Sequence, residues 1–313
     1  MKVLIDSHGR QIRKLRLSLT DRCNLRCHYC MPLDAIFMDD KKYLTPQEYE
    51  IIIEELCQFG LEELRLTGGE PLLRKSFNDI ISRLSKMPLK KIGLTTNGIL
   101  LDKHLHDLKS HRVHHLNVSL DSLDEKNFQR ITHGNYLKRI LTNIENAQKL
   151  NFIIKINVVA MRGVHDHEIF NFVDFSKKTG LEVRFLEVMR IGHALGVQEN
   201  QFISAREMTA KIQTRHTLKT ITKGADSTSF NYLTQDGAQI GFIASESQAF
   251  CGQCSRWRLS ADGIMRACLF KDDGLPIQHK TPLERELIFK SLLGMKPFMR
   301  PAQVSHVMNA IGG

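Results

Sequence analysis

The sequence has no long apolar run, no block of like charges and no low-complexity segment. Its N-terminus lacks the apolar stretch of a signal peptide, and no run of about 18 apolar residues is present to cross a membrane. We therefore expect a cytoplasmic protein without a membrane partner. Because no block of about five like charges occurs, a solvated basic tail does not explain the net charge.

The charge balance is positive, since 44 Lys and Arg residues outnumber 34 Asp and Glu residues and give +10. Such a surplus suits an anionic partner, which leaves nucleic acid, an anionic surface and a phosphorylated small molecule as alternatives. Hydrophobic residues make up 42% of the 313 residues and charged residues 25%, which is typical of a globular protein with a large core.

Six of the seven cysteines form two groups of three, Cys23, Cys27 and Cys30 near the N-terminus and Cys251, Cys254 and Cys268 near the C-terminus. In the cytosol such groups indicate metal or redox chemistry more than disulfides. Each group is one ligand short of a closed four-ligand site. The seventh, Cys57, lies in an apolar helical pattern, and we interpret it as a core residue.

A strand-like run followed by a helical pattern recurs six times along the first part of the chain. The runs lie at 14–19, 64–67, 91–95, 116–120, 153–159 and 183–188, with helices expected at 46–59, 137–150 and 166–178. This alternation predicts an α/β fold with a parallel sheet. Right-handed crossovers would curl six such units into an incomplete (β/α)6 barrel.

Five of these strands alternate apolar residues with polar or cationic ones. In the first strand Arg16 and Ser18 share one face, and in the fifth Lys155 and Asn157 do. A parallel strand covered on both sides should be almost wholly apolar. The pattern therefore predicts a wet, cationic lumen that holds a ligand. For the sixth strand, which contains Arg184, the sequence does not show which residues face the lumen.

The pattern changes after Met189. We expect a loop at 192–202, a helix at 204–212 and short strands at 230–243 with a hairpin turn at Asp236-Gly237. A boundary near residue 195 would divide the chain into a barrel, 1–195, and a C-terminal α+β domain, 196–313.

The first cysteine group has three interpretations. A buried helical seam conflicts with the polar residues around it, and zinc would need a fourth ligand, for which His28 beside Cys27 is poorly placed. An iron–sulfur cluster suits thiolate ligands. The spacing Cys23-x3-Cys27-x2-Cys30, with Tyr29 beside the last cysteine, resembles the signature of the radical S-adenosylmethionine (SAM) superfamily. That resemblance implies a barrel fold, with an open iron that binds SAM and a 5′-deoxyadenosyl radical that abstracts hydrogen from the substrate.

A second motif, Thr67-Gly68-Gly69-Glu70-Pro71, follows the second strand. By itself it would suit a plain strand-to-helix turn. With the cysteine signature it resembles the superfamily motif that binds the SAM amino group, which implies Gly68, Gly69 and Glu70 as cofactor-binding residues. Tyr29, Ser119 and Met189 join them by resemblance to SAM-contacting positions.

The second cysteine group is compatible with a zinc knuckle in which His279 is the fourth ligand. The residues around it, 251–268, however, resemble the second-cluster segment of the GTP 3′,8-cyclase family of molybdenum cofactor biosynthesis. Further resemblances lie at 94–98, 117–121, 155–158 and 311–313. They imply a lyase with two 4Fe–4S clusters, the second one binding the purine of GTP, and the clusters at opposite mouths of the barrel.

The same resemblance implies residues that hold GTP or line its site, namely Arg16, Arg65, Thr95, Lys155, Arg184, Arg256, Trp257 and Arg258. Of these, Arg16, Arg256 and Arg258 are the expected catalytic residues. Guanidinium groups bind phosphate oxygens in pairs, which gives the cations a reason to line a triphosphate site. The tail Gly312-Gly313 is expected to reach into the barrel.

The family further implies an electron donor, a homodimer, and product hand-off to cyclic pyranopterin monophosphate synthase. Two rival functions remain open: a radical SAM enzyme that modifies a peptide or RNA, and a zinc or nucleic-acid-binding protein. Arg190 departs from the family pattern, as does the loop that follows it. The histidines between 104 and 115 show no metal-binding spacing.

Overall fold

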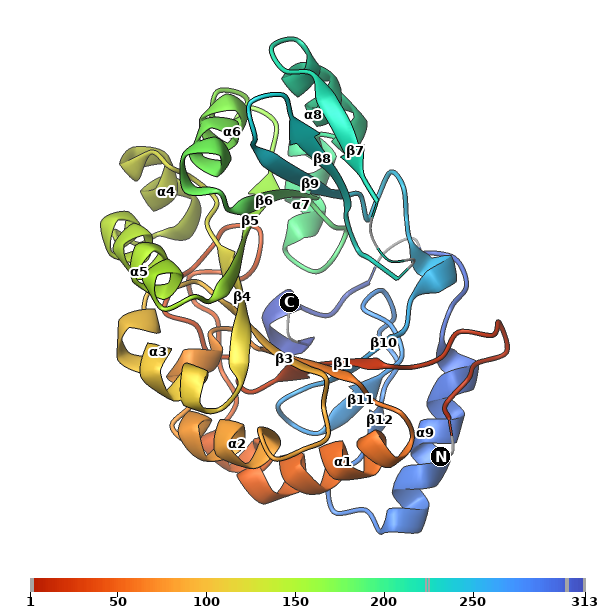
Figure 1. The fold of residues 1–313 in the computed structure, drawn as a ribbon. Helices are drawn as coiled ribbons and strands as arrows, with labels where there is room; N and C mark the ends of the chain where they lie inside the picture. The colour runs from red at the N-terminus through yellow and green to blue at the C-terminus, as the bar shows by residue number, and fades with distance from the viewer. Residues whose placement is uncertain (1–2, 223, 225, 302–303, 312–313) are drawn as a thin grey trace.

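The computed structural model describes residues 3–222, 224, 226–301 and 304–311, which fold around one twisted sheet (Figure 1). Its strands lie in the order β12-β11-β10-β1-β2-β3-β4-β5-β6-β9-β8-β7. The middle of the sheet is a parallel run of β1 Lys14–Ser18, β2 Glu63–Thr67, β3 Lys91–Thr96, β4 Val113–Ser119, β5 Ile153–Ala160 and β6 Glu182–Glu187. The incomplete barrel of six βα units is thereby confirmed.

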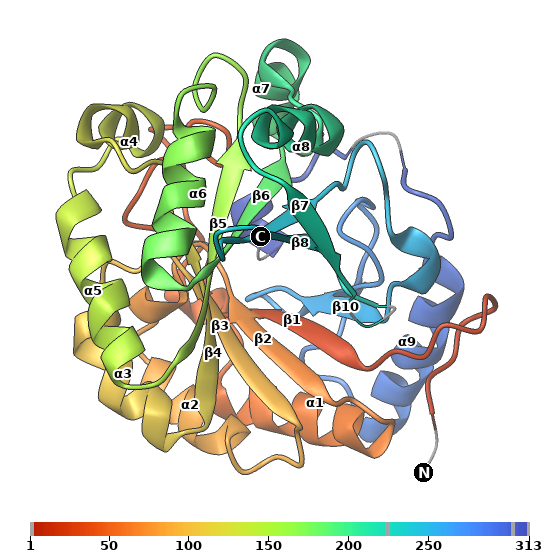
Figure 2. The same ribbon diagram turned by 45° about the horizontal axis from the view of Figure 1, so that its top comes forward.

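Helices cover the outer face of this sheet (Figure 2). They are α1 Pro46–Gln58, α2 Phe77–Leu84, α3 Leu101–Ser110, α4 Glu125–Thr132, α5 Leu137–Lys149 and α6 Glu168–Thr179. The start of α1 shows how the sequence sets a boundary. Thr45 accepts from the N–H of Glu48, whose side chain bonds back to Thr45, and Pro46 occupies the first helical position.

The alternation within the strands separates a dry side of the sheet from a polar side. In β1, Leu15 and Leu17 are 1% and 0% exposed and belong to the main core, whereas Arg16 faces the interior cavity. Leu64 and Leu66 of β2 repeat this arrangement. The core therefore lies between sheet and helices, and the lumen is left for polar side chains.

The chain beyond β6 adds strands to both edges of the same sheet. It forms α7 Ala194–Gln201, α8 Ala205–Gln213, β7 Leu218–Ile221, β8 Phe230–Thr234, β9 Gln239–Ile243, β10 Arg256–Leu259, β11 Ile264–Arg266, β12 Leu275–Pro276, α9 Pro282–Met295 and α10 Met308–Ile311. Strand β9 pairs in parallel with β6, and β10 pairs in parallel with β1. The last described helix, α10, lies inside the ring of strands (Figure 1).

The segment 194–201 is a helix, α7, where the sequence pattern predicts a loop. It has no side-chain cap at its N-terminus, so local signals for a helix are weak. Ala194 instead packs with Ile131, Met161 and Val188 in a small apolar cluster. Because packing rather than propensity stabilises most short helices, the sequence pattern alone could not reveal this one. No helix among the described residues is long and apolar enough to cross a membrane.

Candidate active site

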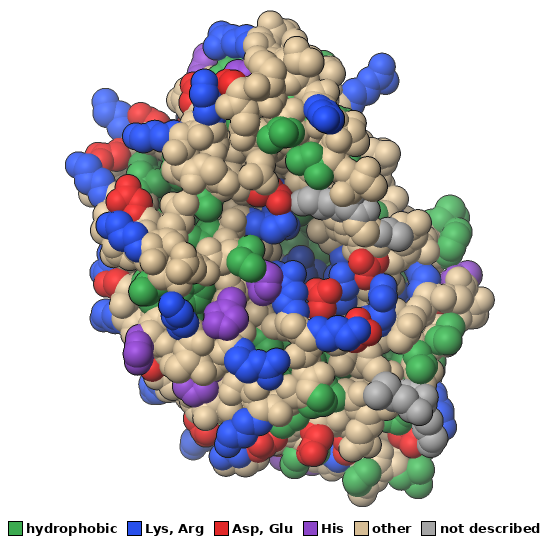
Figure 3. Space-filling model, in the orientation of Figure 1, with side chains coloured by type: hydrophobic (Ala, Val, Ile, Leu, Met, Phe, Trp, Pro, Cys, Tyr) green, Lys and Arg blue, Asp and Glu red, His purple; other side chains and the backbone are tan. Residues whose placement is uncertain are grey.

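A cavity of about 450 Å³ occupies the lumen of the barrel and is lined by both cysteine groups. The face in Figure 3 is hollowed at its middle, and Lys and Arg side chains gather in and around the hollow. Nearly all predicted site residues line the cavity: Arg16, Cys23, Cys27, Tyr29, Cys30, Arg65, Gly68, Gly69, Thr95, Ser119, Lys155, Arg184, Met189, Cys251, Cys254, Arg256, Arg258 and Cys268. The exceptions are Glu70 and Trp257.

The first cysteine group lies in the loop that follows β1. Backbone bonds from Arg26 to Thr132 and from His28 to Ile131 hold this loop against the end of α4. His28 also points Nδ1 at the carbonyl of Ile131, 3.3 Å away. Burial raises the pKa of Cys23 to about 11 and that of Cys30 to about 12, because a thiolate without a metal is costly there.

The two glycines of the second motif clamp this loop in place. The N–H of Gly69 donates to the carbonyl of Thr20 at 2.7 Å, and that of Glu70 to the carbonyl of Arg22 at 2.7 Å. A Cβ on Gly68 would lie 2.5 Å from the Thr20 oxygen, and one on Gly69 would lie 2.3 Å from the Arg22 oxygen. Glycine is therefore required at both positions for the backbones to approach.

Glu70, predicted to bind the cofactor, is not among the residues that line the cavity. Its side chain is fully buried and accepts from Thr96 Oγ1 at 2.8 Å, from the Asn97 N–H at 2.7 Å and from the Leu72 N–H at 3.1 Å. The carboxylate thus joins the ends of β2 and β3. Burial raises its pKa to about 7.

Asp121 is a cavity residue to which sequence reasoning gave no role. Its Oδ2 accepts from the Tyr29 hydroxyl at 2.6 Å and its Oδ1 from the Val159 N–H at 2.8 Å. The carbonyl of Asp121 contacts Nε2 of the buried His165 at 2.6 Å. This network fixes Tyr29 beside Cys30. The signals for Asp121 in the sequence were its place at the polar end of the fourth strand and its position in the family-like stretch 117–121.

The cations of the lumen come from several strands and depress one another's pKa values. Burial, followed by Arg256 and Arg184, lowers the pKa of Arg16 to about 10. Burial, followed by Arg16 and Arg184, lowers that of Arg65 to about 9. Arg184 is 7% exposed, and its Nε and Nη2 atoms have no hydrogen-bond partner among the described residues. Glu182 lies 3.9 Å from Nε of Arg184 and 2.8 Å from Nζ of Lys155, so one carboxylate is shared between two of the lumen cations.

The second cysteine group lies at the opposite end of the lumen from the first. Strand β10 runs parallel to β1, with Arg256 aligned with Lys14 at the start of each. Cys254 therefore precedes the strand pair, whereas Cys23 follows it. Strands of this length span about 15 Å, which leaves room for two ligands between the groups. Burial raises the pKa of Cys254, but Arg256 and Lys296 outweigh it and bring the value to about 6.

Trp257 faces away from the cavity, which corrects its predicted role as a substrate contact. Because side chains alternate along β10, Arg256 and Arg258 point into the lumen and Trp257 points into the core. Trp257 is 1% exposed, and its ring lies 6.2 Å from that of Phe289 on α9. Its place between the two arginines in the sequence thus reflects packing.

Comparison with known proteins agrees with the arrangement of the site. Residues 17–176 match the family model of the radical SAM superfamily, and residues 181–293 match that of Molybdenum Cofactor Synthesis C. GTP 3′,8-cyclase of Synechocystis sp. is 57% identical over 312 residues, covering 100% of this chain and 95% of the relative. The chain belongs to the GTP 3′,8-cyclase family. The family member from Aquifex aeolicus is 38% identical over 286 residues, covering 90% of this chain and 89% of the relative.

A solved structure supports the fold assignment. Streptococcus suis SuiB bound to S-adenosylmethionine superposes with a TM-score of 0.63 at 14% identity, and the match covers 88% of this chain and 66% of that one. At this identity the likeness concerns the fold alone. As a member of the GTP 3′,8-cyclase family and the radical SAM superfamily, the chain is an enzyme that uses SAM and 4Fe–4S clusters.

The residues fit such clusters. Each cysteine of the two groups is partly exposed and lines the cavity, and a 4Fe–4S cluster places each thiolate on a different iron. Among the described residues, no three His, Cys, Asp or Glu side chains are placed to share a single metal ion. His279, the expected fourth ligand of a zinc knuckle, is largely exposed and lies 3.6 Å from Glu48.

The remaining predictions concern Arg190, the histidines between 104 and 115, and the C-terminal tail. Arg190 is exposed and contacts Glu246 and Gln198 beside the cavity rather than within it. Of the histidines between 104 and 115, His104 packs its ring against Phe77. The tail reaches the cavity through Met308 of α10, while Gly312 and Gly313 lie outside the described residues.

Proposed function

We propose that GTP binds between the two cysteine groups and is converted there to 3′,8-cyclo-7,8-dihydro-GTP, the first step of molybdenum cofactor biosynthesis. The observation that carries this proposal is the joint lining of one cavity by two thiol groups and by cations from several strands. Two cluster sites that face one cavity suit a substrate that lies between them. A nucleoside triphosphate has the length and the charge for that position.

The N-terminal site would hold the first cluster through Cys23, Cys27 and Cys30. Tyr29, Gly68, Gly69, Ser119 and Met189 line the cavity and would hold SAM. When bound, this cluster and SAM supply the radical that removes a hydrogen atom from the substrate. Glu70 and Asp121 would act by positioning other residues. Glu70 holds the backbone of Asn97 at the end of β3, and Asp121 holds the hydroxyl of Tyr29.

The lumen cations would hold the triphosphate. Arg16, Arg65, Lys155 and Arg184 project from four strands toward one space, and Thr95 lines it as well. A triphosphate would offset the burial and the mutual repulsion that lower the pKa values of Arg16 and Arg65, because guanidinium groups pair with phosphate oxygens. The phosphates would then lie near the middle of the barrel, and the purine would be free to reach Cys251, Cys254 and Cys268.

The remaining arginines would orient the reacting groups. Arg256 and Arg258 extend from β10 into the lumen beside the second cysteine group, and the Arg256 guanidinium lies 5.2 Å from the centre of the Phe250 ring. The reaction breaks the C3′–H bond of the ribose and forms a C3′–C8 bond to guanine. Fixed cations on one side of the purine would hold C8 against C3′ while an electron and a proton complete the product.

Our remaining proposals concern the organisation of the chain and its partners. We keep the division into a barrel, 1–195, and a second-cluster domain, 196–313, although both contribute to one sheet. An electron donor, a homodimer and hand-off to cyclic pyranopterin monophosphate synthase are the partners we propose. The cytosol is the proposed compartment, because cluster ligands must remain reduced thiols.

Anaerobic protein with reconstituted clusters tests the function. Incubated with GTP, SAM and dithionite, it should give a cyclised isomer of GTP in amounts matching SAM cleavage. Cys268→Ser should abolish the isomer while SAM cleavage continues. Cys57→Ala, a cysteine change in the core outside the cavity, is the matched control and should retain product. SAM cleavage without cyclised GTP would contradict the proposal and favour a peptide or RNA substrate.

A further inference from the structure

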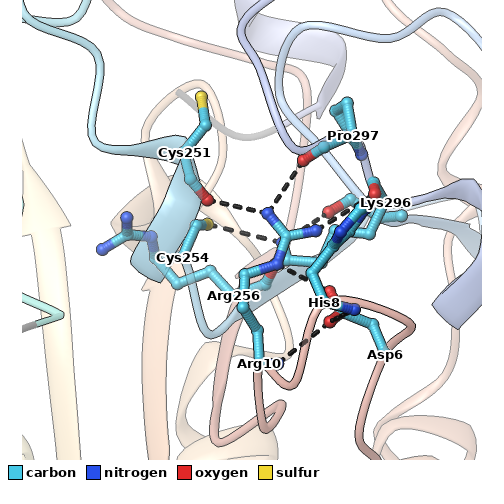
Figure 4. A network of polar contacts seen from close by, with 9 residues as sticks. Asp6, His8, Arg10, Cys251, Cys254, Arg256, Lys296 and Pro297 are labelled. Atoms are coloured by element: carbon cyan, nitrogen blue, oxygen red, sulfur yellow. Dashed lines mark hydrogen bonds and ion pairs between the residues drawn. The ribbon is translucent and has the colours of Figure 1, made fainter.

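A buried lysine contacts the second cysteine group. Lys296 follows α9 and is 4% exposed. Its Nζ lies 2.7 Å from the carbonyl oxygen of Arg256, 3.1 Å from that of Ala267 and 3.4 Å from Sγ of Cys254 (Figure 4). The lysine thus joins the two stretches of chain that carry Cys254 and Cys268.

The acceptors around Nζ favour the charged form of this lysine, against the burial that lowers its pKa. Carbonyl oxygens only accept hydrogen bonds, and a cysteine that ligates a metal is a thiolate, which also accepts. Three acceptors around one nitrogen require three N–H donors, which only the ammonium form has. The carboxylate of Asp6, labelled in Figure 4, is engaged by Arg10 at 2.7 Å. The charges that oppose the ammonium are therefore those of the thiolates.

Arg10 fixes the position of the lysine relative to the cysteines. Its guanidinium donates to the carbonyl of Cys251 at 2.7 Å, to that of Pro297 at 2.8 Å and to that of Lys296 at 3.1 Å. The Arg10 side chain is itself 5% exposed. The N-terminal segment thus connects the cysteine loop to the end of α9. These contacts hold Nζ of Lys296 close to Sγ of Cys254.

We propose that Lys296 is a positioning residue of the second cluster, which holds the Cys254 sulfur in place and sets a fixed positive charge against the thiolate ligands. This inference rests on the proposed function, because it assumes a cluster on the C-terminal cysteines. Hydrogen bonds to the sulfurs and nearby charge tune the potential of iron–sulfur clusters. A fixed cation should favour the reduced, more negative state of the cluster and slow its loss.

The test uses the full chain with Cys23, Cys27 and Cys30 all changed to Ser, so that iron reports only the second site. Lys296→Met removes the charge and the donors, and Lys296→Gln keeps a donor without the charge. The matched control is Lys290→Met on α9, whose lysine is 61% exposed and pairs with Glu286. Iron content, the rate of iron release to a chelator and the midpoint potential from a dithionite titration followed by electron paramagnetic resonance are measured.

We expect the Met variant to release iron about 10- to 100-fold faster, the usual effect of losing a partner that supports a metal ligand. Both Lys296 variants should have a more negative potential, by about 59 mV for a tenfold change in a one-electron equilibrium. Lys290→Met should change neither quantity. A Gln variant that keeps the parent potential and iron-release rate would overturn the proposal.

The outcomes separate this inference from the function on which it rests. If the parent holds no cluster on Cys251, Cys254 and Cys268, the proposed function fails at that site and Lys296 is not at issue. If the Met variant takes up no iron, its circular dichroism decides: a folded protein without iron supports the holding role. If it is unfolded, the Gln variant carries the test, with unchanged potential and iron release as the contradicting result.

Discussion

We expect the buried Arg16 to destabilise the ligand-free protein and to strengthen the binding of GTP. Burial and the neighbouring Arg256 and Arg184 lower its pKa from 12.5 to about 10. A shift of this size corresponds to about 3 kcal/mol against the charged form in the folded state. Because pH 7 lies below both the folded and the unfolded pKa, the arginine is charged in both states, and the whole cost opposes folding at neutral pH.

Replacing Arg16 with Met removes the charge and keeps an apolar stem. Without GTP, the free energy of unfolding of the variant should be about 1–3 kcal/mol larger than that of the parent, and its melting temperature should be a few degrees higher. Its affinity for GTP should fall about 10- to 100-fold, because a charge-assisted hydrogen bond contributes about 1.5–3 kcal/mol. Thermal unfolding without ligand and equilibrium GTP binding measure the two effects.

The matched control is Arg206→Met, which removes an exposed arginine from α8 and should leave both quantities near the parent values. The reasoning would be refuted if Arg16→Met destabilised the ligand-free protein by more than about 1 kcal/mol, because such a loss would mean that the arginine is satisfied within the chain. Unchanged GTP affinity would refute it as well.

Three further predictions concern other parts of the site. Gly69→Ala should weaken SAM binding at least tenfold and destabilise the protein by about 1–3 kcal/mol, because its Cβ would lie 2.3 Å from the Arg22 oxygen. Isothermal titration with SAM measures the affinity, and an unchanged affinity would contradict the prediction. Trp257→Phe should cost about 1–3 kcal/mol in chemical denaturation yet leave the KM for GTP unchanged, whereas a raised KM would restore a substrate contact. His115 has a pKa lowered to about 4 by burial and nearby lysine and arginine side chains, so the unfolded chain takes up its proton first as the pH falls from 6.5 to 4. Between pH 6.5 and pH 4 the free energy of unfolding of His115→Gln should therefore fall by roughly 1–2 kcal/mol less than that of the parent, a value reduced because the side chain is partly exposed. Parallel profiles of unfolding free energy against pH would contradict this prediction.

The barrel could be predicted from the sequence because each of its strands carries its own signal. The alternation of leucines with Arg16 and Ser18 identified both a strand and its polar face. The resemblance of the two cysteine groups to cluster motifs implied that they lie at the two ends of the lumen. Each of these signals is local, so neighbours in space were not needed to interpret them.

The structure departs from the sequence pattern where tertiary contacts decide. Glu70 belongs to a motif whose residues were expected to face the ligand together, but its carboxylate turns inward to Thr96 and Asn97. Trp257 was placed by its neighbours in sequence, although alternation along β10 separates it from them in space. Helix α7 depends on packing against Met161 and Val188. Lys296 carries no spacing signal and became visible only through its contacts.

The central claim is that one cavity presents the ribose of GTP to a radical generated at the N-terminal cysteines. Turnover of GTP deuterated at C3′ tests it most directly, with the 5′-deoxyadenosine product analysed by mass spectrometry. We predict one deuterium in that product for each cyclised GTP, and none when GTP is deuterated only at C4′. Cyclised product without transfer from C3′, or transfer from C4′, would contradict the account.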